Sequence, residues 1–291
     1  MKPLERRYLQ EILKGIPIPS SPAVLSELRA ELQSPAPSHQ SVARIVGRDV
    51  GLSAAVLKSA NSPPFGSNGQ ISSVTAGIKL IGFDTLASLI HERLSSGGAG
   101  ASGGASLERF WDSSSYVALV CADLAEALGG IPPDTAHVFG LFRDCGIPLL
   151  VQRFPDYKKL LGRANDSPNR DFTAVEDDAI FTNHAVMGYL LTRSWKLPKT
   201  LAAGILHHHD YELLRDEDHG LAEQTRLLIA IGAFADHITG QHLRLKQDQE
   251  WKKAGQKVAA YFSRTDQEIS DLADDMLYRL DKKEQGERRA Q

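Results

Sequence analysis

The stretch LERFWDSSSYVALVCADLAEALGG, residues 107–130, decides the fold class of this chain. Its apolar side chains recur every three or four residues, which is the spacing of one face of an α-helix. These positions are Leu107, Phe110, Trp111, Val117, Ala118, Cys121, Leu124, Ala125 and Leu128. Two glycines, Gly129 and Gly130, then end the pattern as a helix C-cap does. The segment therefore predicts one long amphipathic helix with a buried face.

The other periodic segments have the same helical spacing, and none shows the two-residue alternation of a half-buried strand. Leu4, Tyr8 and Ile12 share a face of a predicted first helix. A strongly apolar helix is predicted over 227–238, and the last helix opens at Thr265 with the capping box TDQE. We expect the charged residues 281–291 to fray. The chain is predicted to be all-α.

Residues 95–106, SSGGAGASGGAS, consist only of glycine, alanine and serine. Such a segment has no side chains with which to build a core, and it behaves as a flexible linker or mobile loop. We place the main boundary there. The predicted order is a helical part over 1–94, the linker over 95–106, a second helical part over 107–245, and C-terminal helices with a charged tail over 246–291.

The composition excludes several classes of protein. With 42% hydrophobic and 24% charged residues among 291, the chain resembles ordinary soluble domains. Its formal net charge of −3 does not favour direct binding to nucleic acid. Apolar runs such as 227–235 are far too short to span a membrane. The N-terminus lacks the apolar core of a secretory signal, and two cysteines cannot build a disulfide framework. We expect a cytoplasmic protein with no membrane partner.

Several polar residues interrupt apolar helices in the second part. Arg143 and Asp144 end the run VFGLFRDCG, and Asp236 lies within LLIAIGAFADHI. A carboxylate in such surroundings is costly unless it has a partner. His184 opens another helix, and the run 207–209 is HHH. Histidines and carboxylates that converge from several helices suit a divalent metal ion, which activates a bound water.

The histidine run by itself leaves two interpretations open. Neighbouring helical positions point roughly 100° apart, so at most two of His207, His208 and His209 could bind one ion. The alternative is that they cap a helix C-terminus, where histidine is electrostatically favourable. His137 is interpreted as an ordinary surface residue.

Other motifs resemble the HDOD family, the HD-related output domains of bacterial signalling proteins. In the first half they are IPIPSSP (16–22), DVGLSAAVLKSANS (49–62), ISSV (71–74) and AGIKLIG (76–82). In the second half they are GLFRDCGIPLL (140–150), SWKLP (194–198), AAGILHHH (202–209) and FADHI (234–238). The resemblance covers roughly residues 4–240. It implies an N-terminal helical bundle followed by a degenerate bundle similar to an HD domain.

The related HD phosphohydrolases and HD-GYP phosphodiesterases, which open cyclic di-GMP, use a first-helix histidine, a His-Asp doublet, further histidines and a late aspartate. By resemblance, these positions fall on Ser113, Arg143, Asp144, His184, His208, His209 and Asp236. We take these seven as candidate pocket residues. Because a guanidinium has no lone pair, Arg143 cannot bind a metal. The resemblance thus implies no catalytic residue, no cofactor and no metal; any metal that did bind would take Asp144, His184, His208, His209 and Asp236. We expect Arg143 to replace the cation by bridging Asp144 and Asp236.

The resemblance implies a non-catalytic regulatory module of the kind found in response regulators. Its motifs begin within about fifteen residues of Met1, so we expect the input to come from a separate protein or a bound ligand. A sensor kinase, a receiver or a cyclic-dinucleotide enzyme would be such a partner. Two alternatives stay open: a residual metal-dependent phosphohydrolase, and a sensor that binds a nucleotide or another anion in the HD-like cleft.

Overall fold

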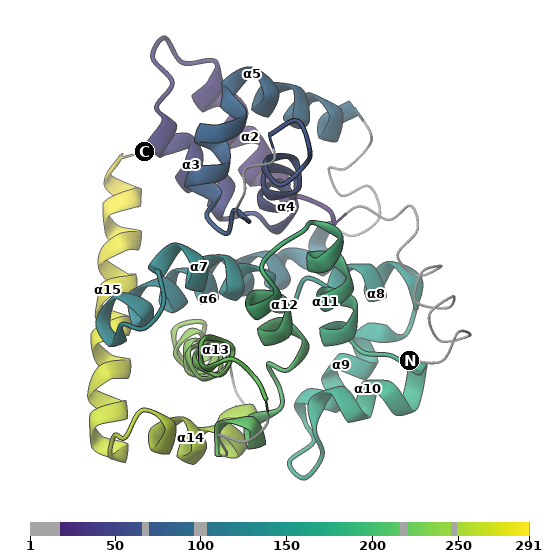
Figure 1. The fold of residues 1–291 in the computed structure, drawn as a ribbon, viewed down its shortest axis with the longest axis vertical. Coiled ribbons are helices and arrows are strands. Elements are labelled where there is room, and N and C mark those ends of the chain that lie inside the picture. Colours follow the sequence, from purple (N-terminus) through teal and green to yellow (C-terminus); the bar gives the residue numbers. More distant parts are fainter. Residues whose placement is uncertain (1–17, 66–69, 96–103, 216–219, 246–248, 291) are drawn as a thin grey trace.

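The computed structural model describes residues 18–65, 70–95, 104–215, 220–245 and 249–290, and every regular element in these ranges is a helix (Figure 1). The all-α prediction is confirmed. The helix predicted around Leu4 and Ile12 lies outside the described residues.

Four helices form the N-terminal part: α2 (Pro22–Leu32), α3 (His39–Gly47), α4 (Val50–Ala60) and α5 (Val74–Ser95). The buried carboxylate of Asp49 caps α4 by accepting the amide proton of Leu52 at 2.7 Å. Its second oxygen accepts the amide proton of Ser21 at 2.6 Å. One aspartate therefore fixes both the start of α4 and the extended entry segment before α2.

Helix α5 is the one segment within the described ranges whose length and composition would allow it to cross a membrane. Gly82 interrupts it with a φ of 76°, so neither half contains the roughly 20 residues that a span requires. A side chain at Gly77 would lie 2.9 Å from Val56, which shows how closely α5 packs on α4. Helix α5 packs on α4 and α3, and much of its remaining surface is exposed.

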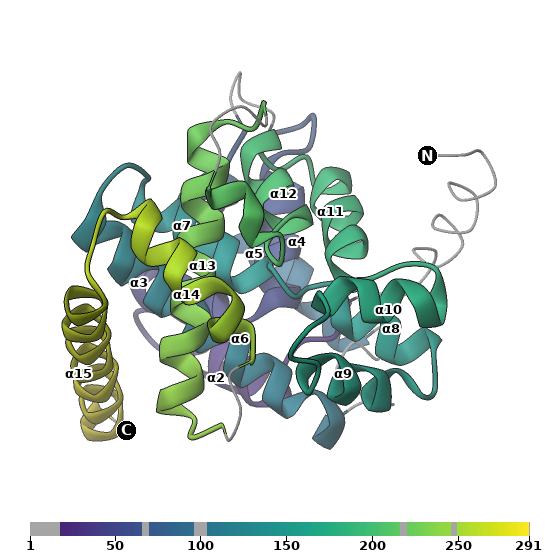
Figure 2. The same cartoon turned by 90° about the horizontal axis from the view of Figure 1, so that it is seen from below.

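The second part is built around α6, α7 and α13, which pack against one another (Figures 1 and 2). Its helices are α6 (Gly104–Leu128), α7 (Pro133–Phe142), α8 (Ile147–Arg153), α9 (Tyr157–Asn165), α10 (Phe172–Ile180), α11 (His184–Ser194), α12 (Lys199–Leu206) and α13 (Glu223–His242), with a 3₁₀ turn at Tyr211–Leu214. The long helix predicted from residue 107 is confirmed as α6. Gly140 permits the close approach of α7 to α6, because a Cβ there would lie 2.8 Å from the sulfur of Cys121.

The chain ends with α14 (Gln249–Tyr261) and α15 (Asp266–Ala290), and α15 stands along one side of the molecule (Figure 1). The predicted capping box is confirmed, since Thr265 and Glu268 exchange hydrogen bonds between side chain and amide. Residues 281–290 belong to helix α15, and the expectation that this end frays stays a prediction. Lys283 pairs with Asp123 at 2.7 Å, and such contacts hold the charged end on α6.

The two parts share one continuous hydrophobic core rather than forming separate bodies. Trp111 of α6 donates a hydrogen bond to the carbonyl of Pro19 at 3.2 Å, which ties the entry segment to the second part. The ends of the predicted linker are helical, because α5 ends at Ser95 and α6 begins at Gly104. Residues 96–103 lie outside the described residues, so the linker and the boundary that it defines stay predictions.

Candidate functional site

Four side chains from three segments meet at one point in the second part. Asp144 follows α7, His184 is the first residue of α11, and His208 and His209 lie in the turn after α12. One ligand atom from each lies within 4.8 Å of the others. The Nε2 atom of His184 is 3.1 Å from that of His208 and 3.2 Å from that of His209. Oδ1 of Asp144 is 3.4 and 3.3 Å from the Nε2 atoms of His184 and His208.

A glycine makes this meeting sterically feasible. A Cβ at Gly146 would lie 2.1 Å from the carbonyl oxygen of His184, so only glycine fits between Asp144 and the start of α11. Asn183 then caps α11 by accepting the amide proton of Val186 at 2.8 Å. The segment CGIP, residues 145–148, therefore sets the position of His184 relative to Asp144.

Each histidine of the cluster uses its other ring nitrogen, Nδ1, to bond an acceptor outside the cluster. Nδ1 of His184 lies 2.7 Å from Glu176, that of His208 lies 2.7 Å from the carbonyl of Ile205, and that of His209 lies 2.8 Å from Glu250. Because carboxylates and carbonyls only accept, each Nδ1 carries a proton. In the neutral rings, three Nε2 lone pairs therefore face one another and Oδ1 of Asp144. Such a centre requires a cation, which is either a proton or a metal ion.

Burial and neighbouring charges shift the pKa values of His184 and His208 in opposite directions. Burial lowers the pKa of His184, but the carboxylates of Glu176 and Asp144 outweigh this effect and raise its pKa above the ordinary value. Burial, together with the neighbouring His209, lowers the pKa of His208 to about 3. His208 is thus neutral at pH 7, as a metal ligand must be, whereas the raised pKa of His184 favours a proton on that ring over one on His208.

Outer partners fix the cluster further, and motif comparison assigned them no role. Glu176 is fully buried and accepts the hydroxyl of Tyr157 on the oxygen that does not face His184. Glu250 also accepts the hydroxyl of Tyr211 at 2.9 Å. Glu176 lies only eight residues before His184 in the sequence, on the preceding helix α10. Glu250 lies on α14, beyond every recognised motif, and no sequence signal points to it.

Arg143 occupies the other side of Asp144. Its Nε donates to Oδ2 of Asp144 at 3.0 Å, and its terminal nitrogen pairs with Asp236 at 2.6 Å. The guanidinium is 9% exposed and also bonds the carbonyl of Gly232. The expected bridge from Arg143 to Asp144 and Asp236 is confirmed. Burial raises the pKa of Asp144, but Arg143 and the adjacent histidines hold it well below its usual value, so this group stays a carboxylate.

The remaining predicted pocket residues do not join the four-group cluster. His207 turns away and is 34% exposed, with Asp210 as its neighbour at 4.0 Å. This agrees with the prediction that at most two of the three consecutive histidines share one site. Asp236 faces Arg143. Ser113 is half-buried on α6, and the contacts found within the described residues do not connect it to the cluster.

The four groups fit one divalent transition-metal ion. Three imidazole nitrogens and one carboxylate oxygen are a donor set that suits zinc, iron or manganese, and the bonds at Nδ1 are typical of metal-binding histidines. The expectation that no metal binds rested on the loss of Ser113 and Arg143 as ligands. Arg143 pairs with Asp236 on the far side of Asp144, whereas the near side offers three imidazole nitrogens and one carboxylate oxygen.

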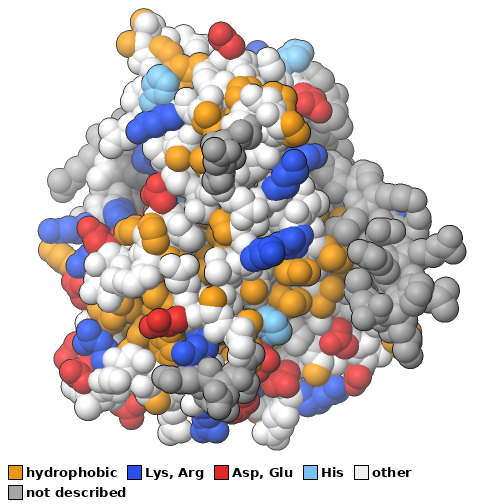
Figure 3. Space-filling view, in the orientation of Figure 1, with side chains coloured by type: hydrophobic (Ala, Val, Ile, Leu, Met, Phe, Trp, Pro, Cys, Tyr) orange, Lys and Arg blue, Asp and Glu red, His pale blue; other side chains and the backbone are white. Residues whose placement is uncertain are grey.

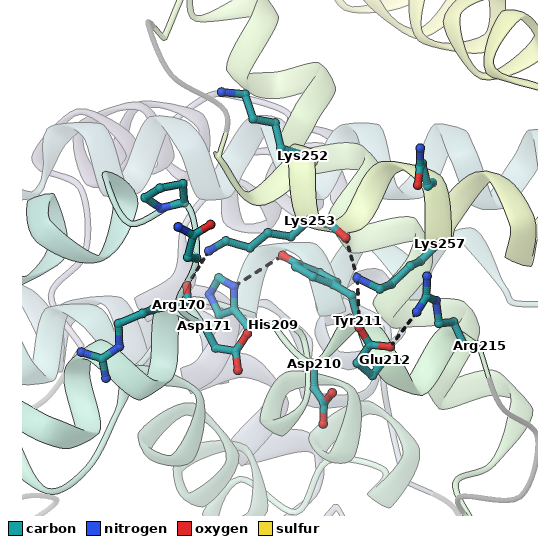
Figure 4. A pocket seen from close by; sticks show the side chains of 13 residues that line it. Arg170, Asp171, His209, Asp210, Tyr211, Glu212, Arg215, Lys252, Lys253 and Lys257 are labelled. Carbon is teal, nitrogen blue, oxygen red and sulfur yellow. Dashed lines mark hydrogen bonds and ion pairs between the residues drawn. The ribbon is translucent and has the colours of Figure 1, made fainter.

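A hollow of about 350 Å³ adjoins the cluster at His209 (Figure 4). It lies between residues 168–171, the 3₁₀ turn at Tyr211–Leu214 and helix α14, and it is lined mainly by charged side chains. His209 belongs to both features, so a ligand in the hollow would lie next to the four-group centre.

Comparisons with known proteins agree with this architecture. A family model described as HDOD domain matches residues 18–211. The fold is similar to that of the MmoQ response regulator from Methylococcus capsulatus, with a TM-score of 0.67 and 17% identity over 89% of this chain and 98% of that chain. A virulence factor from Campylobacter jejuni gives a TM-score of 0.59 and 18% identity over 93% and 96% of the two chains. A signal transduction protein from Marinobacter aquaeolei gives 0.50 and 19%, over 97% and 60%. No curated protein sequence matches the chain.

Proposed function

Because this chain belongs to the HDOD domain family, we propose that it is a regulatory module of bacterial signal transduction that binds one divalent metal ion and does not hydrolyse phosphoesters. The shared fold with a protein described as a response regulator supports a signalling role. Its partner would be a separate signalling protein in the cytoplasm, such as a sensor kinase, a receiver or a cyclic-dinucleotide enzyme.

The observation that carries this proposal is the division of Asp144 between two cations. Oδ1 faces His184 and His208, where one metal ion would bind, and Oδ2 accepts a hydrogen bond from Arg143 at 3.0 Å. In a two-metal hydrolase, the second side of such a carboxylate would hold another ion. Here the guanidinium takes that place and also neutralises Asp236. The site would then contain Arg143 as a fixed cation and one exchangeable metal ion. It would lack the second metal ion that a two-metal hydrolase uses in catalysis.

A bound ion would supply Lewis acidity at the cluster, and this keeps a residual metal-dependent phosphohydrolase as the second candidate. The specific observation in its favour is the complete set of three Nε2 atoms and one carboxylate oxygen. Against it stands the protein's own charge pattern. Arg143 is buried and cannot release its proton, so it neither binds an ion nor acts as a general base.

The test is hydrolysis by the full chain after loading with manganese, iron or zinc. Substrates should include cyclic di-GMP and a chromogenic phosphodiester, and the control is His208→Gln, which removes a cluster nitrogen. We expect the loaded protein to match the control and the protein-free metal solution for both substrates. Turnover by the parent that disappears in His208→Gln would overturn the proposal and establish the phosphohydrolase instead.

A further inference from the structure

The hollow beside His209 carries an excess of positive charge. Its basic lining residues are Arg170, Arg215, Lys252, Lys253 and Lys257, and its acidic ones are Asp171, Asp210 and Glu212. Five cationic side chains against three carboxylates leave an excess of two, although the whole chain has a formal charge of −3. A concave surface with this local sign attracts anions.

Two of the lysines are fixed in place rather than free in solvent. Lys253 and Lys257 are each only 15% exposed. The ammonium of Lys253 bonds the carbonyl of Arg170 and a carboxylate oxygen of Glu250, both at 2.7 Å. That of Lys257 bonds the carbonyl of Lys253 at 2.7 Å and pairs with Glu212 at 3.2 Å. Ordered ammonium groups lose little entropy when a ligand binds, so Lys253 and Lys257 form a preorganised side of the hollow.

Other cations of the lining keep charge available for a ligand. Lys252 donates to the neutral amide oxygen of Gln249 at 3.2 Å, a bond that does not cancel its charge. Arg215 is 63% exposed and shares the single carboxylate of Glu212 with Lys257. Both side chains border the hollow (Figure 4). They can turn toward an anion without disturbing the core.

We propose that this hollow binds a small phosphorylated molecule, with its anionic group held by the cationic lining that Arg215 and helix α14 supply. The volume of about 350 Å³ suits a ligand of nucleotide size. Most of the cationic lining comes from Arg215 and α14, beyond residue 211, where the family match ends. The site is therefore a feature of this chain in addition to its HDOD fold. Its existence does not depend on whether a metal ion binds.

Glu250 joins this hollow to the four-group cluster. One of its oxygens accepts from Lys253 and the other from Nδ1 of His209. A phosphate that shares the ammonium of Lys253 with Glu250 leaves more negative charge on the carboxylate that orients His209, and this strengthens His209 as a metal ligand. Ligand binding and metal binding should therefore favour each other, as linkage requires.

The experiment is isothermal titration of the full chain, both chelator-treated and metal-loaded, with inorganic phosphate, AMP and the uncharged control adenosine. We expect phosphate and AMP to bind the chelated protein, with an affinity that falls as salt rises, and adenosine not to bind. Lys252→Gln combined with Arg215→Gln should weaken binding at least tenfold. The matched control is Lys282→Gln on α15, an exposed lysine beside Tyr278, which should change nothing.

Three results would overturn the proposal: no binding of phosphate or AMP at millimolar concentration, equal binding of adenosine, or undiminished binding by the double variant. Binding that needs metal and disappears in His208→Gln would place the anion on the ion instead of in the hollow, and would count against it too. Hydrolysis of the probes is measured separately, so a failure of the non-hydrolytic proposal is not confused with a failure here.

Discussion

Arg143 is the residue that separates this centre from a two-metal one. Its guanidinium is buried, keeps its proton and bonds two carboxylates that would otherwise bind an ion. The cost of burying it is offset because Asp144 and Asp236 both pair with it. The site therefore carries one cation that belongs to the chain itself.

Replacing Arg143 by Met, which keeps the length and apolar volume, should destabilise the chelated protein by about 3 kcal/mol near pH 7. The reason is that two partly buried carboxylates lose their partner. Denaturant melts measure the change. The control is Arg279→Met, whose pair with Asp275 is exposed and should contribute less than about 1 kcal/mol. Equal effects of the two substitutions would mean that Arg143 does not hold the centre together.

The pH dependence gives a second readout of the same substitution. Asp144 has a pKa below its ordinary value in the folded parent, so it contributes stability above the unfolded pKa of about 3.9 that is lost as pH falls through the folded one. Without Arg143 the stranded carboxylate takes up a proton more readily. The stability difference between parent and Arg143→Met should therefore shrink as pH falls from 7 toward 4, after correction with His→Gln variants. A constant difference would contradict the charge argument.

Restoring the two lost ligands tests the other side of Asp144. Ser113→His combined with Arg143→His removes the guanidinium and offers imidazoles where related hydrolases have them. We expect the doubly substituted protein to bind divalent ions more tightly and to approach two per chain, since Asp144 and Asp236 no longer pair with a guanidinium. Equilibrium dialysis with elemental analysis gives the count. A count no higher than that of the parent would show that Ser113 does not face this site.

At the scale of elements, His137 of α7 lies where the two parts of the molecule meet. Its interpretation as a surface residue is wrong, because its ring packs against α3, where a Cβ at Gly47 would lie 3.4 Å away. Burial, with Lys283 acting in the same direction, lowers its pKa from 6.5 to about 4, although Asp134 and Asp123 oppose the shift. The contact between α7 and α3 thus requires a neutral ring.

The sign of this shift predicts an acid-sensitive contact. A pKa that is lowered by folding gives stability that is present above pH 6.5 and is lost as pH falls through about 4, on the order of 3 kcal/mol. His137→Gln should flatten the stability profile across that range in denaturant melts from pH 7 to 4. The exposed His39 provides the control, and His39→Gln should leave the profile unchanged. Parallel profiles for parent and His137→Gln would rule out this role.

Sequence reasoning predicted what depends on local pattern. The helical period of residues 107–128 gave α6, the capping box gave the start of α15, and the family resemblance, together with the lone pairs that a guanidinium lacks, gave the bridge from Arg143 to Asp144 and Asp236. It missed contacts made by distant segments. Glu250 lies 41 positions from His209 in the sequence. The residues around either one give no sign of this contact. The order of the charged end of α15 depends on Asp123, 160 positions from Lys283.

For the whole molecule, the formal net charge is small, −3 over 291 residues. On the face shown in Figure 3, basic and acidic side chains are interspersed among apolar ones outside the grey atoms. The charged and polar groups on which the two proposals rest are local. They are the four-group cluster and the basic hollow beside it.

In the function that we propose, the near side of Asp144 binds one metal ion and Arg143 replaces a second. The most direct measurement is the stoichiometry of zinc or manganese bound by the full chain in equilibrium dialysis, with His208→Gln and the exposed His39→Gln compared in parallel. The account predicts close to one ion per chain for the parent and for His39→Gln, and a large loss for His208→Gln. No bound ion, two ions, or one ion that persists in His208→Gln would contradict it.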